Sequence, residues 1–79
     1  RDILITGHTA RVPGYTERDH QRLSEQRALA VADYLLSLGS LRAIQATTRG
    51  MGHREPLSDN NTEAGRRQNR RVEIVYTAR

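Results

Sequence analysis

The chain has 79 residues, of which 35% are hydrophobic, with three Tyr and no Phe or Trp. It is therefore one small domain, or part of one, with a thin aliphatic core. The formal net charge is +4 and every basic residue is Arg, which suits an acidic ligand or surface. A general preference for Arg over Lys explains this composition at least as well, because the Arg residues are spread along the chain. The absence of Cys excludes disulfides and thiolate chemistry, and no apolar run approaches the ~20 residues of a membrane span.

The first predicted element is a strand over residues 3–5 (Ile-Leu-Ile), which ends before Gly7. Because successive residues of this run are apolar, we expect both faces of the sheet to be covered there. A polar loop is predicted from Gly7 to Asp19, with Pro13 and Gly14 as its turn signal.

A long amphipathic helix is predicted from about His20 to Leu38, capped by Asp19 and ended by Gly39. Its expected buried stripe has four-residue spacing and is widened by a second set of residues. The stripe consists of Leu23, Arg27, Val31 and Leu35, and the widening set of Ala28, Ala30, Tyr34 and Leu38.

Two strands and a short helix are predicted in the second half. A strand is expected over Leu41–Thr48, followed by a loop over Arg49–His53 and a second loop over Pro56–Asn61. A helix of about two turns starts at residue 61 or 62 and reaches Asn69, and a third strand covers Val72–Thr77. The order strand, helix, strand, helix, strand predicts an α/β or α+β domain.

Catalysis is not indicated by any constellation in the chain. The three His residues (His8, His20 and His53) lack metal-site spacing, and the segment Gly50-Met51-Gly52 is too short for a phosphate-binding loop. We therefore expect no enzyme, no catalytic residue, no metal and no cofactor.

Four Arg residues gather near the C-terminus, at Arg66, Arg67, Arg70 and Arg71. Helical spacing places Arg66 with Arg70 and Arg67 with Arg71 on shared faces. No aromatic residues are interleaved and no nucleic-acid motif is present, so a solvated, partly salt-bridged face is favoured and no nucleic-acid partner is expected. Binding of another anionic polymer through this cluster stays open as a distant alternative.

Three islands carry a resemblance. They read Ile-Thr-Gly-His-Thr over residues 5–9, Leu-Ser-Glu-Gln-Arg-Ala over 23–28 and Asn-Asn-Thr-Glu-Ala-Gly-Arg-Arg-Gln-Asn-Arg-Arg-Val-Glu-Ile over 60–74. In this order they resemble the C-terminal domain of the OmpA family, which the peptidoglycan-associated lipoprotein and the flagellar stator protein MotB share. The resemblance implies an α/β (α+β) fold, a mixed β-sheet flanked by helices in βαβαβ order. It also implies that residues 1–79 are a single OmpA-like domain or the larger part of one, without the family's first strand and helix.

The resemblance further implies a non-catalytic module that grips the peptidoglycan stem peptide at its diaminopimelate or another diamino acid. In the family an Asp takes the ligand ammonium and an Arg takes its carboxylate, as opposite charges require. The family residues fall on Arg27 for the Arg, Thr9 and Ala10 for the Thr-Asp pair, His20 for an Asn, and Arg70 and Arg71 for the basic residues of an Asn-Arg-Arg triplet.

Ala10 stands where the family carries its ligand-binding Asp. An ammonium left unpaired there costs about 1–3 kcal/mol, or roughly ten- to hundredfold in affinity. Glu17 is a candidate substitute carboxylate. We therefore expect a periplasmic module of an envelope- or outer-membrane-associated protein, not itself inserted in the membrane, whose wall binding is weakened or altered. The alternative is a degenerate domain that acts as a scaffold or docks an envelope protein partner.

Overall fold

The computed structural model describes residues 2–38 and 45–77. The elements follow the expected order: β1 (Asp2–Gly7), α1 (Glu17–Ser37), β2 (Gln45–Gly50), α2 (Glu63–Asn69) and β3 (Val72–Thr77). The strands form one sheet in the order β2-β1-β3, in which β1 runs parallel to β2 and antiparallel to β3. The predicted mixed sheet of a βαβαβ domain is therefore confirmed.

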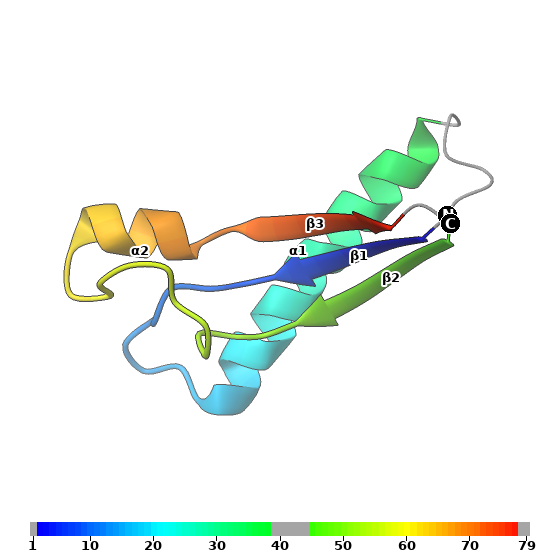
Figure 1. Ribbon diagram of the computed structural model, residues 1–79. Helices are drawn as coiled ribbons and strands as arrows, with labels where there is room; N and C mark the ends of the chain where they lie inside the picture. The colour runs from blue at the N-terminus through cyan, green and yellow to red at the C-terminus, as the bar shows by residue number, and fades with distance from the viewer. Residues whose placement is uncertain (1, 39–44, 78–79) are drawn as a thin grey trace.

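Helix α1 runs along one face of the sheet, while α2 lies beyond the end of the sheet at which β1 finishes (Figure 1). The buried core is small and lies between α1 and the central strand. It consists of Ile3, Ile5, Ala28 and Ala32, with Val31, Leu35, Ala46 and Val72 packed around it. This matches the thin aliphatic core that the composition predicts.

The opposite face of the sheet corrects one expectation. Leu4 pairs in register with Val75, and both side chains therefore point away from the face that carries Ile3 and Ile5. Leu4 is half-buried and Val75 is 53% exposed. Within residues 2–38 and 45–77, no helix covers this face (Figure 1), so the expectation of two covered faces is wrong for the described chain.

Helix α1 begins three residues earlier than predicted, and its cap is Thr16 in place of Asp19. The Thr16 side chain accepts from the Asp19 backbone N–H at 3.1 Å, and the Asp19 carboxylate accepts from the Thr16 N–H at 3.0 Å. This reciprocal pair is a capping box. The bond from the Thr16 N–H holds the pKa of Asp19 below its ordinary value.

The buried stripe of α1 is also shifted from the predicted one. The fully buried residues are His20, Ser24, Ala28 and Ala32. The residues predicted to be central, Leu23, Arg27, Val31 and Leu35, are half-buried on the flank, and Ala30, Tyr34 and Leu38 are exposed. Small residues occupy the line of closest approach because the helix backbone lies against the strands, which leaves larger side chains at the margin.

Two strand glycines permit this approach. A Cβ at Gly7 would overlap the backbone carbonyl of Ser24, and one at Gly50 would overlap the Ser24 hydroxyl. The Ser24 hydroxyl donates to the Gln21 carbonyl at 2.8 Å and accepts from the Gly52 N–H at 2.9 Å. The contact therefore joins α1 to both parallel strands.

The remaining boundaries follow the sequence closely. β2 extends through Arg49 and Gly50, which were expected in a loop, because both pair in register with β1. The expected strand residues 41–44 and the expected cap Gly39 lie outside the described residues. Helix α2 is capped by Thr62, whose side chain accepts from the Gly65 N–H at 2.9 Å. The third strand is confirmed. Among the described residues, neither helix combines the length and apolar character that a membrane span requires.

Replacing Gly7 with Ala should lower the free energy of unfolding by about 3 kcal/mol, since the added methyl meets backbone that cannot move aside. The matched control is Gly14→Ala, because Gly14 has a φ of 87° and nothing within 4 Å of its Cβ position. The control should cost only about 1 kcal/mol, the strain of the left-handed conformation. Urea unfolding of both variants checks this, and equal losses would contradict the close approach.

Candidate functional site

The loop that follows β1 is tied to two other segments at the end of the sheet. The His8 N–H donates to the Arg71 carbonyl at 2.8 Å, and the Thr9 N–H donates to the Gly52 carbonyl at 2.8 Å. The Met51 N–H in turn donates to the Gly7 carbonyl at 3.0 Å. These bonds fix the backbone on which several of the predicted site residues stand.

Arg27 reaches this loop from the middle of α1. Its side chain is half-buried, and its Nη1 donates to the His8 carbonyl at 3.3 Å. A guanidinium has five N–H donors. No acceptor for the other four lies among the described residues. The side chain of Arg27, the predicted anchor, is therefore held by one bond, and its other N–H donors are unused within the described residues.

Thr9 and Ala10 are both buried, each with 2% of its surface exposed. The Thr9 hydroxyl has no hydrogen-bond partner among the described residues. Ala10 brings neither charge nor polarity to its position. The structure thus places both next to the loop carbonyl that Arg27 contacts, and it supplies no carboxylate from residue 10.

His20 is pinned inside the chain. Its Nε2 accepts from the Val12 N–H at 3.0 Å, and its Nδ1 lies 2.8 Å from the Thr16 carbonyl. Because Nε2 accepts, the proton of the neutral ring lies on Nδ1 and is donated to Thr16. Both nitrogens are thereby occupied, so His20 shapes the loop from residue 12 to 16 and offers no free donor.

Two further side chains pack around His20. The rings of Tyr15 and His53 lie 5.4 Å and 4.2 Å from it, centroid to centroid. His53 Nε2 lies 2.7 Å from the Glu17 carboxylate. Glu17, the candidate substitute for the family Asp, is therefore engaged by His53 at the start of α1. The part of the chain that the structure describes holds no group of three or more acidic or His side chains arranged for a metal.

Arg70 and Arg71 point to different partners. Arg70 donates to Glu63 at 2.6 Å, and Glu63 also accepts from Arg66 at 3.1 Å. These two bonds, from Arg70 first and Arg66 second, hold the pKa of Glu63 below its ordinary value. Arg71 lies beyond the end of α2, so its expected shared helix face with Arg67 is wrong. Its Nε donates to Glu73 at 2.7 Å and its Nη2 to the Glu55 carbonyl at 3.0 Å.

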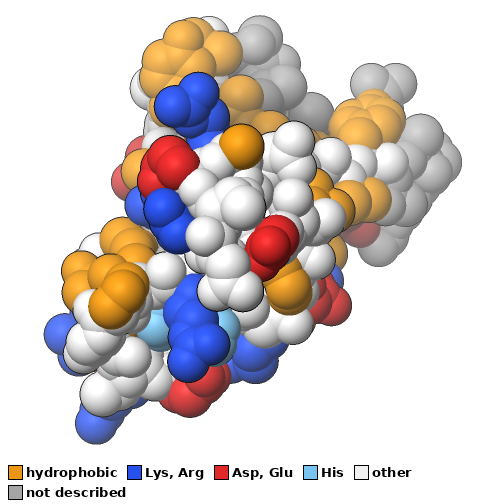
Figure 2. Space-filling view, turned by 90° about the vertical axis from the view of Figure 1, so that its left-hand side faces the viewer, with side chains coloured by type: hydrophobic (Ala, Val, Ile, Leu, Met, Phe, Trp, Pro, Cys, Tyr) orange, Lys and Arg blue, Asp and Glu red, His pale blue; other side chains and the backbone are white. Residues whose placement is uncertain are grey.

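The basic cluster near the C-terminus is therefore partly salt-bridged, as predicted from the sequence. Figure 2 looks onto the end of the molecule at which α2 lies, and it shows Arg side chains spread over this face with acidic ones between them. Arg66 and Arg70 share one carboxylate, Glu63. The positive charge of this end is reduced by these pairs but is not cancelled.

His8 is buried beside Arg71 and Glu73, with 1% of its surface exposed. Its Nε2 lies 3.5 Å from the Glu73 carboxylate, and neither ring nitrogen makes a hydrogen bond within the described residues. Burial, with the nearby Arg71 charge, lowers the pKa of His8 despite Glu73. The Arg71 hydrogen bond also lowers the pKa of Glu73.

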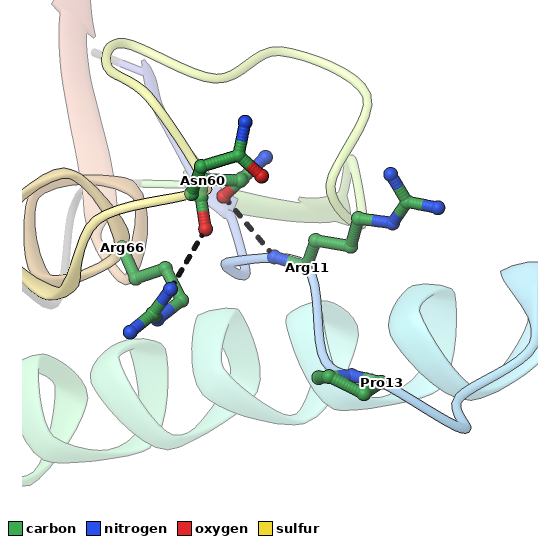
Figure 3. A pocket seen from close by; sticks show the side chains of 5 residues that line it. Arg11, Pro13, Asn60 and Arg66 are labelled. Atoms are coloured by element: carbon green, nitrogen blue, oxygen red, sulfur yellow. Dashed lines mark hydrogen bonds between the residues drawn. The ribbon is translucent and has the colours of Figure 1, made fainter.

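Sequence reasoning missed a hollow between the loop after β1 and the segment that precedes α2. Its volume is about 640 Å³, and it is lined by Arg11, Pro13, Asn60, Asn61 and Arg66 (Figure 3). The Arg11 N–H donates to Asn60 Oδ1 at 3.2 Å across this gap. Arg11 directly follows Ala10, and Asn60 and Asn61 begin the last resembling island, so nearness to these positions is the signal that could have found them.

Asn69 holds one wall of this hollow. It is 1% exposed, and its Oδ1 accepts from the N–H groups of Leu57 and Ser58 at 2.8 Å and 3.0 Å. Its Nδ2 donates to the Ser58 carbonyl at 3.0 Å and to Asn60 Oδ1 at 2.8 Å. The Asn of the Asn-Arg-Arg triplet is thus the structural latch of the segment 57–60.

The sequence and the fold of the chain match those of known proteins. A model described as the OmpA family matches residues 1–70. The chain belongs to the OmpA family. The outer-membrane lipoprotein YfiB of Pseudomonas aeruginosa is 40% identical over 77 residues, which are 96% of this chain and 44% of that protein. The peptidoglycan-binding protein ArfA of Mycobacterium bovis is 42% identical over 69 residues, which are 81% of this chain and 21% of that protein.

Solved structures agree with the fold of this OmpA-family chain. The peptidoglycan-associated lipoprotein from Burkholderia pseudomallei superposes with a TM-score of 0.83 at 34% identity, over 96% of this chain and 62% of that one. The C-terminal domain of Helicobacter pylori MotB gives 0.83 at 28% identity, over 99% and 60%. The chain thus spans less than half of the two curated relatives and less than two thirds of both structures. The OmpA family is non-catalytic.

Acid should destabilise the fold through His8 before it acts on the carboxylates. The unfolded chain takes up the proton near pH 6.5, the ordinary His value, whereas folded His8 takes it up only at lower pH. The free energy of unfolding should therefore fall as the pH drops from 7 to 5. The contributions of Glu63 and Glu73, whose pKa values are lowered, are lost only below about 4.5.

Thermal melts of native protein and His8→Gln at half-unit pH steps check this prediction. The variant should show a smaller drop between pH 7 and 5, relative to its own value at pH 7.5. An identical slope in both proteins would show that His8 does not carry the effect.

Proposed function

We propose that this chain is a non-catalytic peptidoglycan-associating module of a bacterial envelope protein. Family membership supports the proposal, as do the names of its relatives. One relative is named a peptidoglycan-binding protein, and one similar structure is named a peptidoglycan-associated lipoprotein. A third similar structure is described as the cell wall anchor of the T6SS from Pseudomonas aeruginosa, with a TM-score of 0.68 and 38% identity.

The observation that carries the proposal is the placement of Arg27. Its half-buried guanidinium donates once, to the His8 carbonyl, and no described residue accepts from its four other N–H groups. A carboxylate of the wall stem peptide meets these donors with charge-assisted hydrogen bonds. Partial burial makes such a bond stronger than it is at a fully solvated surface.

Ala10 sets the strength of that association. The ligand, diaminopimelate or another diamino acid, carries an ammonium next to its carboxylate, and the buried methyl of Ala10 offers it no partner. Glu17 is already in contact with His53. We infer weakened or altered binding in which the carboxylate half of the ligand supplies most of the affinity. Thr9, His20, Arg70 and Arg71 complete the proposed site as backbone and loop supports.

The location proposed is the periplasm, within a protein associated with the envelope or outer membrane. YfiB of Pseudomonas aeruginosa is named an outer-membrane lipoprotein. A further relative, 40% identical over 72 residues, is named outer membrane protein A of Bordetella avium. A wall-binding module must lie where the wall lies, and the segment itself brings no described membrane-spanning helix.

A second candidate is a scaffold that docks an envelope protein partner. Strand β3 lies at the edge of the described sheet, and Ile74, Val75 and Tyr76 are 51%, 53% and 50% exposed. Consecutive exposed apolar residues on an edge strand favour contact with another protein segment. Binding of an anionic polymer is less favoured, because Glu63 and Glu73 pair with the Arg cluster.

Pelleting with purified sacculi tests the proposal. Native protein should sediment with the sacculi, and Arg27→Gln should lose about tenfold in affinity, as expected for a partly buried charged hydrogen bond. Arg22→Gln is the matched control, since Arg22 lies exposed on the same helix and no described side chain bonds to it. Ala10→Asp should pellet more strongly by restoring an ammonium partner.

Three results separate the alternatives. If native protein and Ala10→Asp both stay in solution, the wall function is wrong and the scaffold becomes the leading account. If Arg22→Gln weakens pelleting as much as Arg27→Gln, general charge and not the Arg27 site is responsible. Binding that requires the Arg66–Arg71 cluster and is lost in 0.5 M salt would indicate the anionic-polymer alternative.

A further inference from the structure

The hollow beside Ala10 is rich in unused hydrogen-bond donors. The Arg11 guanidinium makes no hydrogen bond or ion pair with the described residues, so its five N–H donors are unused there. Asn60 Oδ1 accepts from Arg11 and from Asn69, which leaves the two N–H groups of Asn60 Nδ2 without an acceptor among residues 2–38 and 45–77. The side chain of Asn61 is likewise unengaged there.

Arg66 adds a positioned guanidinium to the same hollow. Its Nε and Nη2 donate to Glu63, and its Nη1 donates to the Asn60 carbonyl at 2.9 Å. Each Nη atom retains one further N–H. Figure 3 shows Arg66 lying across the gap from the Arg11 backbone, with Asn60 between them. The guanidinium is thus held by bonds within the chain.

The lining carries no negative charge. Its residues are Arg11, Pro13, Asn60, Asn61 and Arg66, and none is acidic. Glu63 neutralises part of Arg66 but also serves Arg70, and the Asp59 carboxylate accepts from the Asn61 N–H at 2.8 Å. An ammonium placed in this hollow meets amide oxygens but no carboxylate, whereas a carboxylate meets the unused N–H groups of Arg66, Asn60 and Asn61.

We propose that this hollow is a carboxylate site, so that the chain selects the anionic groups of its ligand and not the zwitterion. The proposal deepens the wall-binding function and rests on it for the source of the carboxylate, the peptidoglycan stem peptide. With Ala10 at the adjacent position, the ligand ammonium contributes nothing to affinity, and a second carboxylate contributes through Arg11 and Arg66.

Three small molecules isolate these contributions. Diaminopimelate carries two carboxylates and two ammonium groups, pimelate is the same carbon chain without the amino groups, and cadaverine is the corresponding diamine without carboxylates. Each is titrated into the native chain labelled with ¹⁵N, and the backbone and side-chain signals of the lining residues are followed. Pimelate should shift the signals of Arg11, Asn60 and Asn61 at least as strongly as diaminopimelate, and cadaverine should not.

The variant pair Arg11→Gln and Arg67→Gln supplies the control. Both remove one positive charge from an exposed side chain, but only Arg11 lines the hollow. Arg11→Gln should weaken pimelate about fivefold, as for an exposed ion pair, and Arg67→Gln less than twofold. Because Arg11 bonds to the described residues only through its backbone, the variant should keep its fold.

Pelleting with sacculi, run beside the titrations, separates this inference from the wall function. If pimelate shifts the NMR signals of the hollow and Arg11→Gln pellets less than native protein, the carboxylate site and the wall function are both supported. If native protein pellets and the hollow does not respond to pimelate, or responds equally to cadaverine, the carboxylate site is wrong while the wall function stands. If pimelate binds at Arg11 and nothing pellets, the carboxylate site stands and its proposed source is wrong.

Discussion

The close approach of α1 to the two parallel strands is the constraint on which the rest of the structure depends. Gly7 and Gly50 have no Cβ where Ser24 lies, so the helix backbone packs directly on the strand ends. The Ser24 hydroxyl then accepts from the Gly52 N–H and fixes the loop after β2. Because the core that the described residues form has few buried aliphatic side chains, this backbone contact, and not a large hydrophobic area, sets the position of the helix.

The site follows from that placement. One turn beyond Ser24, α1 presents Arg27 to the carbonyl of His8, at the point where β1 gives way to its loop. Hydrogen bonds to Gly52 and Arg71 hold the same loop from the other side. The result is an end of the molecule with many fixed donors and few free acceptors. Such an arrangement favours anions, and for this reason we propose that a wall ligand binds through its carboxylates more than through its amino groups.

Much of the fold could be predicted from the sequence, because alternation, glycine and turn signals are local. The strand over residues 72–77 and the short helix before it are examples. The start of α1 was predicted three residues too late. Thr16 and Asp19 cap the helix together, but the prediction took Asp19, which directly precedes the predicted first residue His20, as the cap. The buried stripe of α1 was also misplaced. Small residues lie at its centre because the helix backbone touches the strands, and the periodicity of large hydrophobic residues does not reveal such a contact.

The site was predictable only in part. Arg27 was predicted through the resemblance and stays a prediction, and the structure shows that it makes one hydrogen bond among the described residues. His20 is buried and holds the loop from residue 12 to 16 through hydrogen bonds with the backbone of Val12 and Thr16, and periodicity cannot reveal such bonds. The hollow joins segments 49 residues apart, Arg11 and Asn60, so that only the tertiary structure brings them together.

The account is tested most directly by the side-chain Nε–Hε signal of Arg27 in the intact ¹⁵N-labelled chain, followed while soluble stem peptide is added. We predict that this signal shifts with ligand concentration and that its hydrogen exchange slows, because the guanidinium acquires a carboxylate partner. An unchanged Arg27 signal at ligand concentrations that shift other residues would contradict the central claim that Arg27 is the anchor of the site.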